Sequence, residues 1–242
     1  PVLIHEQNAV AGFTNSQLSR VAKTVCQAFP NTFPAQEKVV TTGNPVRQEI
    51  SEILNPSWRY QERDKAGLPL RILIVGGSLG AQALNERVPK ALKQLNVPLS
   101  VYHQCGQNHA ESTRARYENA PASLQVEVQP FIEDMAKAYS DADLVICRAG
   151  ALTVTEIATA GVAAIFVPLP SAVDDHQTAN AGFLANINAA KICPQATMTP
   201  ESLKTLLEPM LNRQLLMEMA VKARRQAQPD ATQHVVRLIQ EL

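Results

Sequence analysis

Short apolar runs alternate with amphipathic segments over the middle of the chain. Runs of strand length stand at 71–75, 99–103, 124–128, 144–147, 163–167 and 190–193. Between them, apolar residues recur at helical spacing in the segments 81–95, 110–117, 135–139, 152–160 and 177–184. Strands that alternate with helices form parallel sheets through right-handed crossovers. The pattern therefore predicts an α/β fold with a doubly wound parallel sheet that helices cover on both faces.

The first part of the chain holds only a piece of a second α/β unit. Residues 2–5, 15–22 and 24–28 predict a strand, a helix and another strand, which are too few to enclose a core. Because the chain begins at Pro1, we expect that an earlier part of this unit is absent. Residues 2–29 should then pack poorly or pair with another chain.

The last part of the chain is helical in pattern. Two amphipathic stripes cover 203–211 and 215–223, and Pro229 interrupts the pattern after them. Asp230 is placed to cap a final helix that ends at the C-terminus.

The composition narrows the class of protein. The 242 residues include 22 Lys and Arg and 22 Asp and Glu, so the formal net charge is zero and no nucleic-acid partner is expected. Charged residues make up 18% and hydrophobic residues 45%, which favours a well-packed domain over a disordered one. No apolar run reaches the roughly 18 residues of a membrane span, and we expect no signal peptide. Cysteines 26, 105, 147 and 193 lack metal-ligand or redox spacing, so we expect them to be reduced.

A glycine-rich loop, Gly76-Gly-Ser-Leu-Gly80, joins a predicted strand to a predicted helix. Glycines let a ligand approach the backbone, and a helix N-terminus offers N–H groups to a phosphate or pyrophosphate. A tight turn without a ligand is the alternative. The spacing is neither the dinucleotide fingerprint nor a P-loop. The next strand is followed by Gln104, with no acidic residue to bind the ribose of NAD.

The loop over 147–156 is the second candidate. Arg148 and Gly150 follow a predicted strand, and Thr153 and Glu156 share one face of the helix that comes next. The Glu156 carboxylate can accept two hydrogen bonds, as a ribose diol requires. The alternative is that Glu156 only offsets the helix dipole.

The third candidate loop ends in polar residues at the start of a helix: Asp174, Asp175, His176, Gln177 and Asn180. These side chains could bind sugar hydroxyls, or an aspartate could simply cap the helix. A metal site at Asp174, Asp175 and His176 is a weaker alternative, because no second cluster accompanies it. Three such loops at the carboxyl edge of one sheet predict a nucleotide-sugar site. His103, His109 and His234 have no candidate partners nearby in the sequence, and we expect them at the surface or in the core.

Five segments carry a family resemblance: 5–12 (HEQNAVAG), 43–47 (GNPVR), 75–81 (VGGSLGA) with Asn85, 148–156 (RAGALTVTE) and 175–180 (DHQTAN). Together, and in this order, they resemble the MurG family of peptidoglycan N-acetylglucosaminyltransferases. The resemblance implies a GT-B fold, in which two Rossmann-like domains face each other across a cleft. It implies a remnant of the acceptor domain over 1–45, a donor-binding domain over 46–222, and a helix over 223–242 that returns to the acceptor domain.

The resemblance also implies an activity. Enzymes of this family transfer N-acetylglucosamine with inversion from UDP-N-acetylglucosamine (UDP-GlcNAc) to the muramoyl 4-hydroxyl of lipid I, which gives lipid II. No essential metal and no cofactor are expected. The implied location is the cytoplasmic face of the bacterial inner membrane, as a peripheral protein whose contact with the membrane surface lies mainly in the absent part.

On the donor side, the resemblance implies a role for each matching residue. Gly77 and Ser78 would contact the diphosphate, with Arg47 and Arg148 near it and Asn85 counted in the same group. Phe131 and Ile132 would lie against the uracil, Glu156 would hold the ribose hydroxyls, and Leu152 and Thr153 would border the sugar and the diphosphate. The hydroxyls of N-acetylglucosamine would bond to His176, Gln177 and Asn180.

On the acceptor side, Asn8 and Asn15 match acceptor or cleft residues, and Glu6 is the candidate general base. The family's N-terminal glycine-rich loop with its histidine has no counterpart in this chain. Three alternatives therefore stay open. The chain could bind UDP-GlcNAc without catalysing transfer, or belong to another lipid-directed UDP-sugar transferase such as a diacylglycerol glycosyltransferase. A sugar-nucleotide epimerase is possible in principle.

Overall fold

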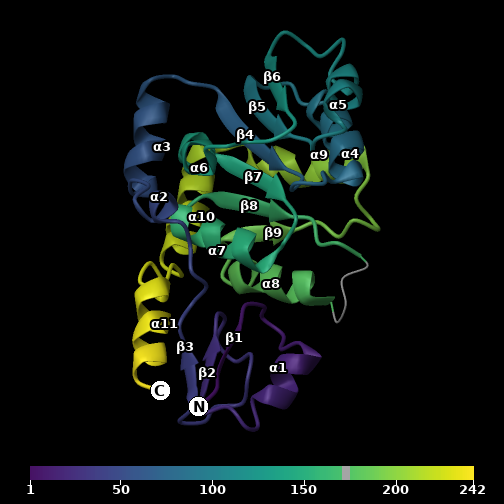
Figure 1. Ribbon diagram of the computed structural model, residues 1–242. Helices are drawn as coiled ribbons and strands as arrows, with labels where there is room; N and C mark the ends of the chain where they lie inside the picture. The colour runs from purple at the N-terminus through teal and green to yellow at the C-terminus, as the bar shows by residue number, and fades with distance from the viewer. Residues whose placement is uncertain (171–174) are drawn as a thin grey trace.

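The computed structural model describes residues 1–170 and 175–242, and its strands form two separate parallel sheets (Figure 1). The small sheet has the order β1-β2-β3, with β1 (Leu3–Glu6), β2 (Thr24–Gln27) and β3 (Val39–Thr41). The large sheet has the order β6-β5-β4-β7-β8-β9. Its strands are β4 (Leu70–Val75), β5 (Leu99–Gln104), β6 (Leu124–Gln129), β7 (Leu144–Cys147), β8 (Ala163–Phe166) and β9 (Ala190–Ile192). The predicted doubly wound parallel sheet is confirmed.

Helices connect the strands of the large sheet: α4 (Gln82–Leu92), α5 (Ala110–Arg116), α6 (Met135–Asp141), α7 (Ala151–Ala160) and α8 (His176–Ala185). After β9 come α9 (Pro200–Leu207), the 3-10 turn η2 (Glu208–Met210) and α10 (Arg213–Arg224). The candidate Asp174 lies outside the described residues. Among the described residues, no helix is both long and apolar enough to cross a bilayer.

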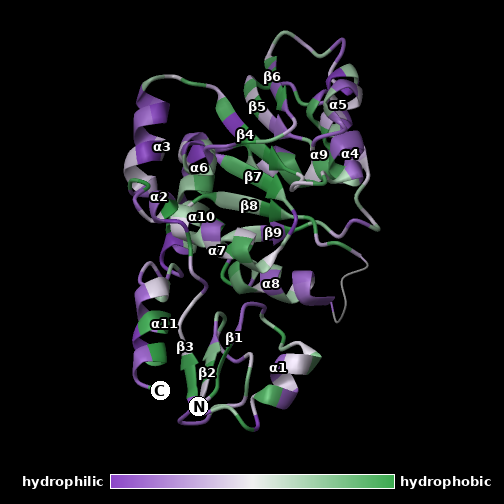
Figure 2. Cartoon of the chain, in the orientation of Figure 1, coloured by the Kyte–Doolittle hydropathy of each residue, from purple (hydrophilic) through white to green (hydrophobic). Residues whose placement is uncertain are grey.

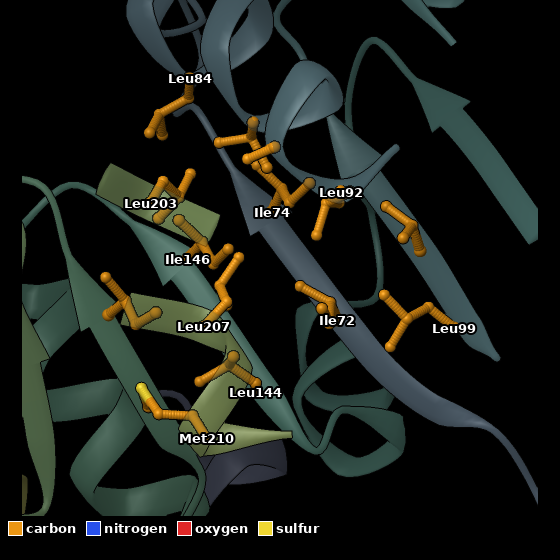
Figure 3. Packing of buried hydrophobic residues seen from close by; sticks show 14 of the residues in the cluster. Ile72, Ile74, Leu84, Leu92, Leu99, Leu144, Ile146, Leu203, Leu207 and Met210 are labelled. Atoms are coloured by element: carbon orange, nitrogen blue, oxygen red, sulfur yellow. The ribbon is translucent and has the colours of Figure 1, made fainter. Parts of the chain in front are cut away.

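Alternate residues of the central strands point to opposite faces of the large sheet, so the sheet has two apolar cores. On one face, Ile72 and Ile146 pack with α4, α9 and η2 (Figure 3). On the other face, Leu73 and Val145 pack with α6, α7 and α8. β7 and β8 are hydrophobic along their length, as strands buried on both faces should be (Figure 2). All four cysteines are unpaired and buried, as expected.

The small sheet is thinly packed. It carries α1 (Phe13–Leu18), which is shorter than the predicted helix and begins earlier. Its own buried apolar cluster consists of Ile4, Ala22, Val25 and Phe33, while Phe13 and Val21 are exposed. Ala28 and Phe29, by contrast, are buried in the core on the α6, α7 and α8 face of the large sheet, so the poor packing expected of residues 2–29 does not hold for this end of the segment. Pairing of residues 2–29 with another chain stays a prediction.

The C-terminal helix α11 (Ala231–Gln240) lies beside β3, so the chain ends next to the sheet in which it begins (Figure 1). The Lys23 ammonium donates a hydrogen bond of 2.8 Å to the Leu242 carbonyl. Asp230 occupies the N-cap position of α11, as predicted, but its side chain makes no capping hydrogen bond.

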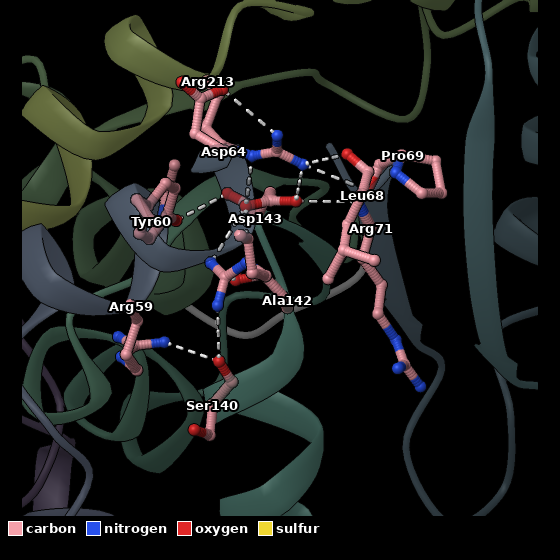
Figure 4. A network of polar contacts seen from close by, with 12 residues as sticks. Arg59, Tyr60, Asp64, Leu68, Pro69, Arg71, Ser140, Ala142, Asp143 and Arg213 are labelled. Carbon is pink, nitrogen blue, oxygen red and sulfur yellow. Dashed lines mark hydrogen bonds and ion pairs between the residues drawn. The ribbon is translucent and has the colours of Figure 1, made fainter. Parts of the chain in front are cut away.

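Three elements were not predicted, namely β3, α2 (Gln48–Ser51) and α3 (Pro56–Lys65). α3 is mostly hydrophilic (Figure 2) and is joined to the sheet by a buried polar network (Figure 4). At its centre, the fully buried Asp143 accepts hydrogen bonds from Arg63 at 3.0 Å, from Arg213 and from the Arg71 backbone N–H. This network lies where β4 and β7 begin, at the edge of the sheet opposite the candidate loops, so it supports the fold rather than the site.

Candidate functional site

The candidate loops meet where the order of the large sheet changes direction. β4 and β7 are neighbours, and the chain leads away from them to opposite sides of the sheet. Val75, which ends β4, pairs with Cys147, which ends β7, so the loops to α4 and α7 start side by side. Neither helix has a side-chain cap at its N-terminus. Uncapped N–H groups of two helices at such a point form an anion-binding position typical of nucleotide sites.

The glycine-rich loop has a defined turn. Gly77 and Gly80 have φ values of +83° and +76°, which favour glycine. The Gly80 N–H donates to the Gly77 carbonyl at 2.9 Å, which closes the turn. Ser78 and Leu79 stand exposed at its tip.

Arg47 and Glu156, which were predicted from separate motifs, are in direct contact, and Tyr139, which was not predicted, joins them. The Arg47 guanidinium donates to one Glu156 carboxylate oxygen at 3.2 Å, and the Tyr139 hydroxyl donates to the other at 3.2 Å. Burial, together with the Glu156 charge, raises the pKa of Tyr139 well above its usual value, so this hydroxyl stays a donor. A carboxylate offers about four acceptor positions, so Glu156 can still accept two more hydrogen bonds.

The predicted uracil-side residues differ in exposure. Phe131 has 52% of its surface exposed, whereas Ile132 is buried in the core on the α6 face. An exposed ring can stack on a base, and Ile132 can fix the backbone that carries the ring.

The Arg148 side chain is bound within the protein. It donates to the Val167 carbonyl at 3.0 Å and to the Gln195 side chain at 2.6 Å. Burial lowers the pKa of Arg148 from its usual value. An arginine guanidinium keeps its charge in proteins. Arg148 therefore joins the loop after β7 to the end of β8 and brings a positive charge to this edge of the sheet.

The start of α8 lies over the loop after β7. The Gln177 side-chain oxygen accepts from the Ala149 N–H at 3.3 Å and from the Leu169 N–H at 2.9 Å. Asp175 is the N-cap residue, with a left-handed backbone (φ +51°) and no capping hydrogen bond from its side chain. His176 opens the helix. The described residues contain no cluster of three or more His, Cys, Asp or Glu side chains placed to hold a metal.

Leu152 and Thr153 occupy the first turn of α7. Leu152 has 49% of its surface exposed, and Thr153 is partly exposed on the same turn. Both therefore stand beside the uncapped N-terminus, where the sugar and diphosphate were predicted.

Asn180 reaches from α8 to the small sheet. It is 1% exposed, its oxygen accepts from the Ala9 N–H at 2.8 Å, and its amide donates to the Asn8 side chain and to the Ala149 carbonyl. The structure thus brings the predicted donor residue Asn180 and the predicted acceptor residue Asn8 into direct contact.

The surroundings of Glu6 do not suit a general base. The side chain is buried, and its two oxygens accept from the backbone N–H groups of Asn8 and Gly12 and from the side chains of Asn8 and Asn15. Burial alone would raise the pKa of Glu6, but these hydrogen bonds outweigh it and lower the pKa. A carboxylate that accepts this many hydrogen bonds and is hard to protonate stabilises the loop after β1. Asn15 stabilises the same loop through its hydrogen bond to Glu6.

Sequence reasoning missed a buried polar chain below the glycine-rich loop. Asn85 is 3% exposed, donates to the Cys105 carbonyl at 2.9 Å and lies 3.0 Å from the ring of His103. The other ring nitrogen of His103 lies 2.9 Å from the Tyr117 hydroxyl. Burial lowers the pKa of His103 to about 3. Asn85 therefore supports the loop from beneath. The sequence feature that could have predicted this buried polar chain is the polar pair His103-Gln104 at the end of an apolar strand.

A parallel α/β domain with a nucleotide-type switch point, joined to a smaller parallel sheet, defines a GT-B glycosyltransferase, as predicted. The chain belongs to glycosyltransferase family 28: residues 71–235 match the model of the glycosyltransferase family 28 C-terminal domain.

Similar proteins agree with this assignment. The UDP-N-acetylglucosamine–N-acetylmuramyl-(pentapeptide) pyrophosphoryl-undecaprenol N-acetylglucosamine transferase of Acinetobacter baumannii (strain AYE) is 76% identical over 242 residues, which is 100% of this chain and 66% of the relative. The enzyme of the same name from Psychrobacter arcticus is 51% identical over 99% of the chain and 66% of its own length. The chain therefore spans about 66% of the length of these curated relatives.

Solved structures show the same likeness. The crystal structure of Acinetobacter baumannii MurG matches with a TM-score of 0.92 and 71% identity, covering 100% of this chain and 67% of that one. The glycotransferase of kitacinnamycin, at 19% identity and a TM-score of 0.64 over 93% of this chain and 56% of that one, shares the fold alone. The resemblance inferred from five short segments is confirmed.

Proposed function

We propose that this chain is the donor-binding part of an inverting N-acetylglucosaminyltransferase that acts on UDP-GlcNAc and lipid I and forms lipid II. The observation that carries the proposal is the pair of uncapped helix N-termini, of α4 and α7, at the switch point between β4 and β7. The substrates named for relatives that are 76% identical over the whole chain support the choice of substrates.

Release of UDP requires that negative charge on the diphosphate be stabilised as the glycosidic bond breaks. We infer that the exposed turn at Ser78 and Leu79 and the N-terminus of α7 supply this stabilisation, because preorganised N–H groups are effective at such positions. We assign Gly77 and Ser78 to the diphosphate through the turn they form. Arg148 adds positive charge, and Asn85 acts through the loop rather than by touching the donor.

The nucleoside is assigned to two further positions. The free acceptor capacity of Glu156 suits the two ribose hydroxyls, while Arg47 and Tyr139 hold the carboxylate in place. The exposed Phe131 ring is assigned to the uracil, with Ile132 as its buried support.

The transferred sugar would lie between the first turn of α7 and the start of α8. Leu152 and Thr153 border it from α7. His176 and Gln177 approach it from α8, and Asn180 closes the space against the small sheet.

For the acceptor side, we assign Glu6, Asn8 and Asn15 to the architecture of one loop. We do not retain Glu6 as the base, because its lone pairs are taken and its pKa is lowered. Residues 1–45 and the C-terminal segment 223–242 form the acceptor-side part, and 46–222 form the donor domain. The predicted helix over 223–242 is shorter in the structure, because α10 ends at Arg224 and α11 spans Ala231–Gln240.

We place the enzyme at the cytoplasmic face of the bacterial inner membrane, as a peripheral protein. The support is the undecaprenol-linked acceptor in the names of the relatives. Sedimentation with vesicles that carry an undecaprenyl diphosphate lipid tests this, and equal recovery with and without vesicles would contradict it.

Calorimetric titration of the 242-residue chain with UDP-GlcNAc tests the donor site, with NADH and ATP as controls. Selective binding of the UDP-sugar is the expected result. No binding, or equal binding of ATP, would contradict the donor assignment.

The runner-up function is a binding module that holds UDP-GlcNAc without transferring the sugar. It is favoured by the coverage of about 66% of the relatives. A lipid I turnover assay separates the two, because only a transferase forms lipid II. Diacylglycerol as a second acceptor tests the alternative lipid-directed activity.

A further inference from the structure

One buried side chain holds the glycine-rich loop from below. Gln104 is the last residue of β5 and pairs with Val75 at the end of β4. It is 3% exposed, so its amide group is withdrawn from solvent. The side-chain oxygen accepts from the Gly77 N–H at 3.0 Å, and the side-chain nitrogen donates to the Gly77 carbonyl at 2.9 Å.

This two-point contact helps to set the conformation of Gly77, together with the turn hydrogen bond from the Gly80 N–H to the Gly77 carbonyl. Gly77 has a φ of +83°, and a Cβ built on it would meet no atom within 4 Å. Contact with neighbouring atoms therefore does not select the backbone angles at this glycine. The Gln104 side chain holds its N–H, and shares its carbonyl with the N–H of Gly80.

The same amide also reaches the segment on the other side of β5. The Gln104 nitrogen donates a second hydrogen bond, of 2.9 Å, to the Pro130 carbonyl, directly before Phe131 and Ile132. One planar amide group thus bonds to the diphosphate-side loop and to the uracil-side segment at once.

The backbone around Gln104 is itself fixed. The Asn85 amide donates to the Cys105 carbonyl, and Gly106 lies so close to Gly80 that a Cβ on either would collide with the other loop. The amide of Gln104 therefore projects from a rigid base, which a positioning role requires.

We propose that Gln104 is the positioning residue of the donor site: it presents the turn at Gly77 to the diphosphate and ties that turn to the segment that carries Phe131. The inference rests on the proposed function. A further consequence follows from hydrogen-bond chemistry. Only an amide can both accept from an N–H and donate to two carbonyl oxygens here, so neither glutamate nor an apolar residue of similar size can replace it.

The test compares UDP binding by the wild-type chain, Gln104→Leu and Gln104→Glu, with Gln125→Leu as a control on the exposed part of the neighbouring strand. Loss of the two bonds to Gly77 should weaken UDP binding by about tenfold or more in Gln104→Leu. Gln104→Glu should lose at least as much, because a carboxylate would face the carbonyls of Gly77 and Pro130. Gln125→Leu should bind as the wild type does.

Hydrogen–deuterium exchange without ligand provides a readout that general destabilisation would not reproduce. In Gln104→Leu, exchange should rise in the peptides over 76–80 and 130–132 and stay unchanged in β7 and β8. UDP affinity within twofold of wild type in either Gln104 variant, or faster exchange throughout the large sheet, would overturn the inference. No UDP binding by the wild-type chain would instead overturn the proposed donor site, and this inference with it.

Discussion

The side-chain amide of Asn180 donates a hydrogen bond of 3.2 Å to the side-chain oxygen of Asn8, although the two residues are 172 positions apart. Asn180 belongs to α8 on the large sheet, and Asn8 follows β1 of the small sheet. Asn8 is in turn held by the Glu6 carboxylate. A continuous polar chain thus crosses from one half of the molecule to the other.

Asn180→Ala is therefore expected to weaken the contact between α8 and the loop after β1. The change leaves the Ala9 N–H and the Ala149 carbonyl without their side-chain partner, which should cost about 2 kcal/mol of unfolding free energy. Urea denaturation measures the loss, and hydrogen exchange over 7–12 should rise. Asn186→Ala, at the exposed end of the same helix, is the matched control. Equal stability of the two variants would contradict this account.

Glu6→Gln should change how stability depends on acidity. The folded pKa of Glu6 lies below its ordinary value of 4.5, so its contribution is complete above pH 4.5 and is lost as the pH falls through the folded pKa. The unfolding free energy of the wild type should therefore drop on acidification below about pH 4.5 more than that of Glu6→Gln. Parallel curves for the two proteins would show that the hydrogen bonds to Glu6 do not act as described.

His103→Gln should reduce the pH dependence of the unfolding free energy at higher pH than Glu6→Gln does. Burial lowers the pKa of His103 to about 3, against an ordinary value of 6.5, so between these values the unfolded chain binds a proton that the folded protein excludes. Stability should rise with pH across that window by up to about 1.4 kcal/mol per unit. The variant should lack this slope, and His234→Gln should keep it. Denaturant unfolding at pH 4, 5, 6 and 7 is the measurement.

Glu156→Ala should weaken binding of UDP-GlcNAc by about tenfold, since it removes the acceptor of two charge-assisted hydrogen bonds. Measuring both proteins with both UDP and 2′-deoxy-UDP makes the test specific to the ribose hydroxyl. The wild type should bind UDP more tightly than the deoxy compound, and the variant should bind both alike. If the variant still prefers UDP, the ribose hydroxyls are held elsewhere.

The large sheet could be predicted because its signal is local. Apolar runs such as 144–147 are too short for helices, and their alternation with helical segments leaves few topologies. The carboxyl edge of such a sheet also gathers its loops by geometry, so the sequence predicts that the loops at Gly77 and Glu156 lie together.

The missed features depend on partners that are distant in sequence. α3 has no apolar stripe that would predict burial. It is fixed instead through Arg59 and Arg63, which donate to Ser140, Ala160 and Asp143, 80 to 101 positions away. The role of Gln104 depends on a loop 27 positions earlier, and that of Glu6 on how its own loop folds back. Sequence pattern identifies such polar residues but not the atoms that they bind.

Arg47 stands in the segment that joins the small sheet to the large one, and its guanidinium reaches Glu156 on α7. Arg47 is the second residue of the proposed donor domain, so a rotation of the two halves that displaces this joining segment would move the charge relative to the carboxylate. A ligand held by Glu156 would then bind with an affinity that depends on the angle between the halves. By thermodynamic reciprocity, the bound ligand would favour the angle at which it binds best. A single coupling free energy would therefore link ligand binding to the angle between the two halves.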